Sequence, residues 1–475
     1  MEGDVMVDIG GLAAQTAGIG VRPYLELTFD SDGDGAPGAR EALFGIEATD
    51  LLVFAHGWNS ERSTAIRLFD RFYAPFADLV GNGVRLGYVG VVWPSIRFAD
   101  EPIPDFDARG AGARGLLGAG GRTGPGGRPG ASGVLAEPGH GAALGPATRQ
   151  ALGAFWPGRA AELDRICELL EERPAEEGAF AEFGALVREL AGVDGVGAGD
   201  DLAAAFAPRE VPAFLTEDVI QVCRSFTEAL VEAGATLPGE SPGGLAGEGF
   251  SVGGGMRTLW NGAKEVLRQA TYYQMKARAG VVGEHGLGPV LAELAGRRPA
   301  LRIHLIGHSF GGRVVSFALR ALPTGARNVK SLTLLQGAFS HYAFAESLPH
   351  DRDRAGALHG LQGRVDGPVT ACHSPYDSAL KVFYPLASRM AGDSAGLMGF
   401  DERWGAIGHD GVQAVPGAPR LTLDAALRGG LPAAGCVSVD AGSVVRSGGA
   451  PSGAHSDICH EDLARLVVVA GRMGR

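Results

Sequence analysis

One short segment limits the folds open to this chain more than any other. An apolar run begins at Leu301, leads into Gly307-His-Ser309-Phe-Gly311 and is followed by apolar residues at helical spacing. A buried strand must therefore turn sharply into a helix, with a serine at the turn. We expect glycine on both sides of that serine because side chains there would collide with neighbouring backbone. The serine itself must adopt a strained conformation beside a helix N-terminus, which favours negative charge.

Strand patterns recur along the chain and alternate with helical ones. The strand patterns are Pro23–Phe29, Asp50–Ala55, Val84–Trp93, Val329–Gln336, Pro368–His373 and Gly435–Asp440. The helical patterns of the second half are Trp260–Arg278, Leu287–Leu294 and Leu463–Ala470. Strands that alternate with helices indicate a mostly parallel sheet covered by helices on both faces. The expected fold class is therefore α/β, and His304, within one apolar strand, is expected to be a hydrogen-bonded core residue.

The alternation is interrupted in the first half of the chain. A Gly-rich segment, Arg109–Gly145, is too poor in apolar residues to bury a core, and a second such stretch covers Pro238–Gly255. Three helical faces lie between them, at residues 163–170, 180–190 and 214–230. We predict a core in two parts, 1–96 and 256–475, separated by an insertion at 97–255 that is Gly-rich and helical. The insertion acts as a cap or is a helical subdomain without a catalytic role.

Composition excludes several classes of protein. The net charge of -12 argues against nucleic acid as a partner, and five cysteines without metal-site spacing indicate neither a disulfide framework nor a zinc site. The acidic N-terminus and the lack of a long apolar run predict a cytoplasmic protein without stable membrane insertion. No metal-binding cluster or dinucleotide fingerprint is present, so we expect a reaction without a cofactor or metal.

A second informative segment follows the strand Asp50–Ala55. That apolar run stops at His56-Gly57-Trp58, and a helical pattern begins soon after it. The segment is therefore a strand-to-helix loop at the carboxyl end of a strand. Active sites of open α/β sheets lie at those ends.

These segments resemble the α/β-hydrolase family, and in particular uncharacterised bacterial hydrolases. The resemblance is carried by His56-Gly57-Trp58, by a strand ending in Trp-Pro-Ser at 93–95, and by GHSFGGR at 307–313. It covers roughly two thirds of the chain and omits the insertion and the Gly-rich tracts. The resemblance implies a nucleophile elbow at Ser309 and a triad in the chain order serine, acid, histidine. Ser309, Asp377 and His455 follow this order.

Each member of that set has a chemical reason and an alternative. A serine hydroxyl is a weak nucleophile unless an imidazole removes its proton, and His455 lies in the loop between the last strand and the last helix. His460 is the competing base, although it lies at the start of the terminal helix. Asp457, which follows His455, is expected to cap that helix. Asp377 would orient the imidazole; its alternative role is to cap the helix that follows it.

The resemblance also implies an oxyanion hole made of two backbone N–H groups. Phe310, the residue after the nucleophile, would supply one, and Trp58 in the His-Gly-X loop would supply the other. The supporting residues would be His56, Gly57, Gly307, His308 and Gly311. For His56 the alternative role is a general base.

The expected function is a serine hydrolase that cleaves a carboxylic ester through an acyl-enzyme. A serine peptidase, a thioesterase or an acyltransferase would use the same triad, because they share the acyl intermediate. A binding protein that has kept the fold without catalysis is a hypothesis of another class. The expected substrate is a small-molecule or lipid-like ester, and the sequence identifies no protein partner.

Overall fold

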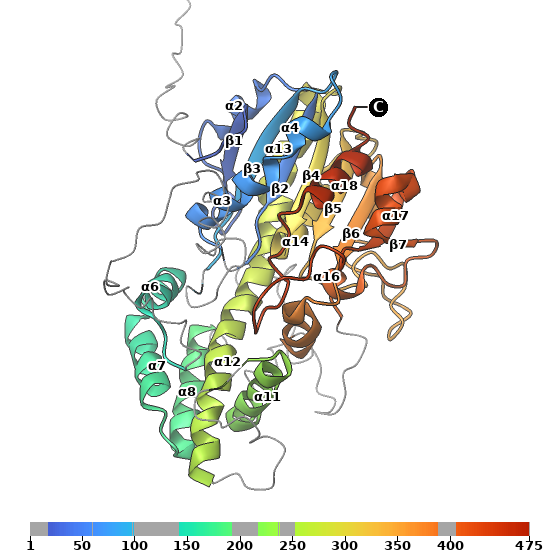
Figure 1. Cartoon of the computed structure of the whole chain (residues 1–475). Helices are drawn as coiled ribbons and strands as arrows, with labels where there is room; N and C mark the ends of the chain where they lie inside the picture. The colour runs from blue at the N-terminus through green and yellow to red at the C-terminus, as the bar shows by residue number, and fades with distance from the viewer. Residues whose placement is uncertain are drawn as a thin grey trace, which may run out of the picture.

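A computed structural model describes residues 18–58, 60–96, 98, 142–191, 217–235, 237, 252–387 and 405–474. Its centre is one sheet of eight strands in the order β1-β3-β2-β4-β5-β6-β8-β7, and every pairing is parallel (Figure 1). The strands are β1 (Tyr24–Thr28), β2 (Asp50–Ala55), β3 (Leu86–Val92), β4 (Arg302–His308), β5 (Val329–Leu335), β6 (Pro368–His373), β7 (Arg420–Thr422) and β8 (Gly435–Asp440). The predicted α/β class is confirmed.

Helices connect the strands and cover the sheet. The main ones are α2 (Ala39–Phe44), α3 (Arg62–Tyr73), α4 (Phe76–Leu79), α6 (Pro146–Phe155), α7 (Ala160–Glu172), α8 (Glu177–Leu190), α11 (Val219–Glu232), α12 (Val252–Val281), α13 (Gly288–Arg297), α14 (Phe310–Ala318) and α18 (Glu461–Gly471). Shorter turns are α16 (Ile407–Asp410), α17 (Leu423–Ala425) and the π-helical η3 (Val282–Leu287), η6 (Ala379–Phe383) and η8 (Ala426–Gly430). In the described part of the chain, none of the helices is long and apolar enough to cross a membrane.

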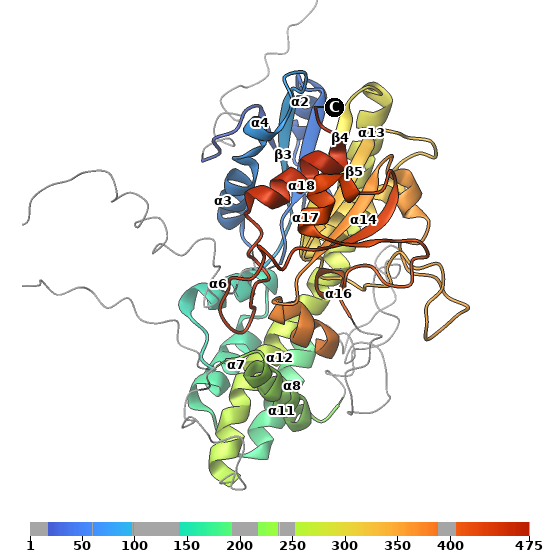
Figure 2. The same ribbon diagram turned by 45° about the vertical axis from the view of Figure 1, so that its right-hand side comes forward.

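Both faces of the central strands are buried, which explains why these strands are continuous apolar runs. Successive side chains of β2 point to opposite faces: Leu51 and Val53 pack into one apolar cluster, Leu52 and Phe54 into another. The first cluster is completed by α2, α13 and α14, and the second by α3, α4 and α18. Figure 2 shows α3 and α18 in front of the sheet, on the same side.

The strand order places a topological switch between β2 and β4. The chain leaves β2 toward β3 on one side of the pair and leaves β4 toward β5 on the other side. Connections that diverge in this way open a crevice outside the carboxyl ends of the two strands, where ligands of open α/β sheets bind. Ala55 pairs with Gly307 at that edge, so the loop after β2 adjoins the turn after β4.

The described part of the insertion forms a helical lobe at one end of the sheet. Helices α7, α8 and α11 pack along the first half of α12, α6 packs on α7, and the second half of α12 runs up to the sheet (Figure 1). Trp260 of α12 stacks on Phe180 of α8 with ring centroids 4.3 Å apart. The apolar residues of this lobe are continuous with the cluster on one sheet face. The predicted domain boundary at residue 255 falls inside α12.

Several predictions need correction. The helical patterns at 260–278 and 287–294 belong to one run, because η3 joins α12 to α13. The Gly-rich segment Arg109–Gly145 lies outside the described residues up to 141, but Ala142 and Leu144 are buried in the core. The stretch Pro238–Gly255 also lies mostly outside them. Strand β7 was missed because it has only three residues, of which Arg420 and Thr422 are exposed, and this is too short for an apolar pattern.

Candidate active site

The turn after β4 has the predicted strained geometry. Ser309 has φ 54° and ψ -122°, a conformation that L-residues rarely adopt, and lies directly before the first residue of α14. A Cβ on Gly307 would lie 2.5 Å from the Gly311 carbonyl oxygen, and one on Gly311 would overlap the Ala55 carbonyl oxygen. The glycines are therefore required by close packing against neighbouring backbone, as the sequence predicts.

One continuous relay of hydrogen bonds joins Ser309, His455 and Asp377. The Ser309 Oγ lies 2.9 Å from Nε2 of His455, and the His455 Nδ1 lies 2.8 Å from Oδ2 of Asp377. Ser309 is 2% exposed and Asp377 is fully buried, while His455 remains partly accessible. Three residues far apart in the sequence thus meet at the carboxyl ends of β4, β6 and β8.

The Asp377 carboxylate makes the contacts of both roles that the sequence presented as alternatives. Its Oδ2 faces His455 and also accepts a hydrogen bond from Gln336 Nε2 at 3.3 Å. Its Oδ1 accepts one from the backbone N–H of Leu380 at 3.0 Å, at the start of η6. The two roles are compatible because a carboxylate has two oxygens and about four lone pairs.

The loop that carries His455 is fixed by a second aspartate. Asp457 Oδ2 accepts hydrogen bonds from the backbone N–H groups of Arg446 and Ser447 at 2.9 and 2.7 Å. Asp457 does not cap the terminal helix, as the sequence had suggested, because α18 begins only at Glu461. The His460 Nε2–H donates to Asp457 Oδ1 at 2.8 Å, whereas the imidazole bonded to the Ser309 hydroxyl is that of His455.

His308 supports the relay from inside the turn. Its Nε2 donates to the backbone carbonyl of His455 at 2.9 Å, and this bond holds the loop against the end of β4. Burial, together with the nearby ring of His455, lowers the pKa of His308 to about 3. His308 is therefore neutral at physiological pH, and its ring contacts the backbone of the loop that carries His455.

His56 shapes the loop after β2. Its Nδ1 donates to the Gly57 carbonyl at 2.9 Å, its Nε2 accepts from the backbone N–H of Trp93 at 3.3 Å, and its ring stacks on the Trp93 indole. These two bonds specify one neutral tautomer. Burial lowers the pKa of His56 to about 4, so the imidazole stays neutral. Both nitrogens are occupied by backbone groups of this loop region, which disfavours the alternative role of His56 as a base.

The same contacts orient the peptide between Gly57 and Trp58. Its carbonyl is held by His56 and by the Ser95 hydroxyl, and in a trans peptide the N–H points the opposite way. The Trp58 N–H therefore points away from these two side chains. Gly57 itself contacts the serine, since a Cβ there would lie 2.6 Å from the Ser309 Cβ. The Phe310 N–H, in the first turn of α14, has no carbonyl partner within its helix.

A narrow cavity of about 80 Å³ opens beside the serine. Its walls come from α14, from the loop after β2, from the loop of His455, and from α12 of the helical lobe. Glu265, Arg268, Gln269 and Tyr272 of α12 line one wall. Sequence analysis missed these residues and Gln336. The spacing i, i+3, i+4, i+7 of the four α12 residues was the available sign, because it places polar groups on one side of an otherwise apolar helix.

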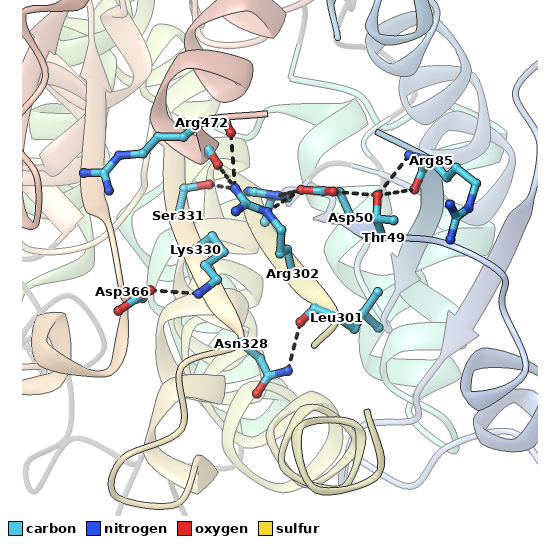
Figure 3. Close-up of polar contacts among 12 residues, drawn as sticks. Thr49, Asp50, Arg85, Leu301, Arg302, Asn328, Lys330, Ser331, Asp366 and Arg472 are labelled. Atoms are coloured by element: carbon cyan, nitrogen blue, oxygen red, sulfur yellow. Dashed lines mark hydrogen bonds and ion pairs between the residues drawn. The ribbon is translucent and has the colours of Figure 1, made fainter. Parts of the chain in front are cut away.

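A second Ser–His–Asp arrangement lies at the opposite end of the sheet. Ser331 Oγ is 3.0 Å from His304 Nδ1, and His304 Nε2 is 3.0 Å from Asp50 Oδ1. Figure 3 shows Asp50, Arg302 and Ser331 in this network, where the Arg302 guanidinium also donates to Asp50. All three members are buried, and Ser331 lies inside a regular strand, so substrate cannot reach its hydroxyl. His304 is the satisfied core histidine that the sequence predicts.

The electrostatics of this buried network favour a charged carboxylate. Burial alone would raise the pKa of Asp50, but hydrogen bonds from His304, Thr49 and Arg302 outweigh burial and lower it. Burial lowers the pKa of His304 more than Asp50 raises it. The network thus joins the amino ends of β2, β4 and β5, far from the serine turn.

Among the described residues, no three His, Cys, Asp or Glu side chains are grouped so that they could hold a metal ion. Four of the five cysteines are buried, and all five are free thiols. Comparison of the chain with protein-family models, with curated proteins and with solved structures gives no match in any of the three. A functional assignment therefore depends on the fold and on the geometry of this site.

Proposed function

We propose that this chain is a serine hydrolase of the α/β-hydrolase type that cleaves a carboxylic ester through an acyl-enzyme. One observation carries the proposal: the unbroken hydrogen-bond relay Ser309–His455–Asp377 at the carboxyl edge of a parallel sheet. The order of these residues in the chain is serine, acid, histidine, as in that family. The strained serine and the adjoining cavity add independent support.

The chemistry follows from the contacts. His455 Nε2 takes the proton of the Ser309 hydroxyl as the oxygen attacks the ester carbonyl carbon. Asp377 accepts from the Nδ1–H and stabilises the imidazolium that forms. The imidazolium then protonates the departing alkoxide, which leaves an acyl group on Ser309. A water molecule, deprotonated by the same imidazole, releases the acid and restores the serine.

The negative oxygen of the tetrahedral intermediate requires donors that are already in place. We assign this role to the backbone N–H groups of Phe310 and Trp58. The Phe310 N–H belongs to the first turn of α14, where the helix dipole also favours negative charge. The Trp58 N–H is oriented by the bonds of His56 and Ser95 to the preceding carbonyl.

Ester hydrolysis is the preferred reaction among those that share an acyl-enzyme. Departure of an alkoxide demands less of the site than departure of an amine, as in a peptidase. An acyltransferase would need a bound acceptor that keeps water away from the acyl-enzyme. A non-catalytic binding protein would have no need for the strained serine, which is retained against a conformational cost of about 1–3 kcal/mol.

The test is covalent labelling with a fluorophosphonate probe, followed by hydrolysis of p-nitrophenyl esters from acetate to palmitate. Ser309→Ala should abolish both labelling and turnover. Ser331→Ala is the matched control because it removes the serine of the buried Ser–His–Asp network, and it should leave both intact. Folded wild-type protein that neither labels nor hydrolyses any ester would refute the proposal.

A further inference from the structure

The cavity beside Ser309 has a polar wall that the ester chemistry itself does not require. Glu265, Arg268 and Gln269 lie on one side of α12, and each is less than a tenth exposed. Apolar residues of the same helix, such as Leu267 and Ala270, are fully buried in the core. Buried polar groups destabilise a fold unless they are paired, so the polar groups of this wall reduce the stability of the folded protein wherever they lack a partner.

The hydrogen bonds within the wall determine how Gln269 is oriented. Its Nε2 donates to Glu265 Oε1 at 2.7 Å, and Glu265 is also paired with Arg268 at 3.2 Å. The amide cannot be reversed, because a carboxylate accepts hydrogen bonds and offers no donor to an amide oxygen. The amide oxygen of Gln269 therefore points away from Glu265. Among the described residues it has no hydrogen-bond donor.

A second unpaired group belongs to Trp58, another residue that lines this cavity. The indole Nε1–H of Trp58 is buried and, within the described ranges, has no acceptor. The indole is held edge-on against Tyr272, with ring centroids 5.6 Å apart. An unpaired acceptor on α12 and an unpaired donor on the loop after β2 thus belong to residues that line one cavity with the serine. Buried donors and acceptors in native proteins are nearly always paired, by protein, water or ligand.

We propose that the substrate carries an uncharged hydrogen-bonding group, such as a hydroxyl, close to the ester that Ser309 attacks. This inference rests on the proposed hydrolase function. The hydroxyl donates to the Gln269 amide oxygen and accepts from the Trp58 indole N–H. The Glu265–Arg268 pair positions Gln269, and because its two charges compensate each other, it offers no free charge to an ionic substrate. The small volume of the cavity excludes a long alkyl chain from this wall.

The experiment compares substrates that differ only by a methyl and a hydroxyl group. On the acyl side these are the p-nitrophenyl esters of 3-methylbutyrate and of each enantiomer of 3-hydroxybutyrate. On the alcohol side they are the acetates of 3-methylbutanol and 1,3-butanediol. Hydrolysis of these two esters is measured by the acid that it releases. Each rate is divided by the rate of the same ester in hydroxide, which removes differences in intrinsic reactivity. We expect kcat/KM to favour the hydroxyl compound of at least one pair by about tenfold or more.

The Gln269→Met variant, which keeps the side-chain length and removes the acceptor, should erase that preference. Gln274→Met is the control, because Gln274 lies on the same helix but does not line the cavity. Fluorophosphonate labelling of Ser309 in both variants shows that the serine remains reactive. Two results would overturn the inference: a preference for the methyl compound in both pairs, or a hydroxyl preference that survives Gln269→Met. In either case, turnover of p-nitrophenyl acetate would still support the hydrolase. Loss of all labelling and turnover in wild-type protein would instead refute the hydrolase itself.

Discussion

The contact between the loop after β2 and the serine turn provides a sharp test of the site. Gly57→Ala adds one methyl group, whose carbon would lie 2.6 Å from the Ser309 Cβ and 3.0 Å from His308 Nδ1. Carbon atoms in contact lie about 3.5–4.0 Å apart, so the loop and the serine turn must separate by about 1 Å. Neither side yields easily, since β2 and β4 are paired in the sheet up to Ala55 and Gly307.

A displacement of this size falls on both parts of the proposed machinery. It moves the Ser309 hydroxyl relative to His455, or it moves the Trp58 N–H away from the oxyanion. A misplacement of about 1 Å reduces the rate of an enzyme by about 10²-fold, which corresponds to about 2.7 kcal/mol of transition-state stabilisation. The cost in folding free energy should be about 1–3 kcal/mol, typical of one excess methyl group in a packed region.

The assay is kcat/KM for p-nitrophenyl acetate, measured with urea denaturation of the same preparation. Gly83→Ala is the matched control, because a Cβ at Gly83 meets nothing within 4 Å and Gly83 lies far from the site in the turn before β3. We expect wild-type turnover from the control and a loss of about 10²-fold from Gly57→Ala. If Gly57→Ala keeps at least half of the wild-type kcat/KM, the proposed coupling between the two loops is wrong.

Three further predictions concern the base, the buried network and pH. His455→Gln should lower turnover by about 10⁴-fold and leave the fold intact, whereas His460→Gln should keep activity; the reverse result would reassign the base. Asp50→Asn should cost about 1–3 kcal/mol in urea denaturation, because it leaves the buried His304 and the partly exposed Arg302 without their anion, and a loss below about 0.5 kcal/mol would contradict this. In the folded protein the pKa values of His56 and His308 are about 4 and about 3, whereas both are 6.5 in the unfolded chain. At a pH between these values the two histidines bind protons only in the unfolded chain. Stability should therefore fall below about pH 6.5, by about 2 kcal/mol for each of them at pH 5, and equal stability at pH 5 and pH 7 would refute it.

Much of the fold could be predicted from the sequence because the central strands of the sheet are buried on both faces. Strands such as β2 must then be uninterrupted apolar runs, and the turn at Ser309 must be flanked by glycine. The residues brought together at the site follow from the order of strands, since the loops after β4, β6 and β8 share one edge. Their hydrogen bonds do not follow, because spacing along the chain says nothing about side-chain geometry.

The failures have specific causes. The three-residue edge strand β7 is too short to show an apolar pattern. The joining of α12 to α13 depends on η3, where Gly283 packs directly against the Val314 carbonyl of α14, a contact invisible in helical periodicity. The role of Asp457 was mistaken because a carboxylate near a helix start predicts a cap, while here it binds the N–H groups of a loop that is adjacent in space.

The length of α12 has a consequence for how the molecule folds. Its first half completes the packing of α8 and α11, and its second half forms the polar wall and continues into η3 against α14. Residues of both halves belong to the same apolar cluster as the sheet. The helical lobe is therefore part of the cooperative unit that contains the serine turn, and the two should unfold in a single transition. Removal of the lobe would uncover Trp260 and the neighbouring apolar surface of α12, so the sheet could not be expected to remain soluble without it.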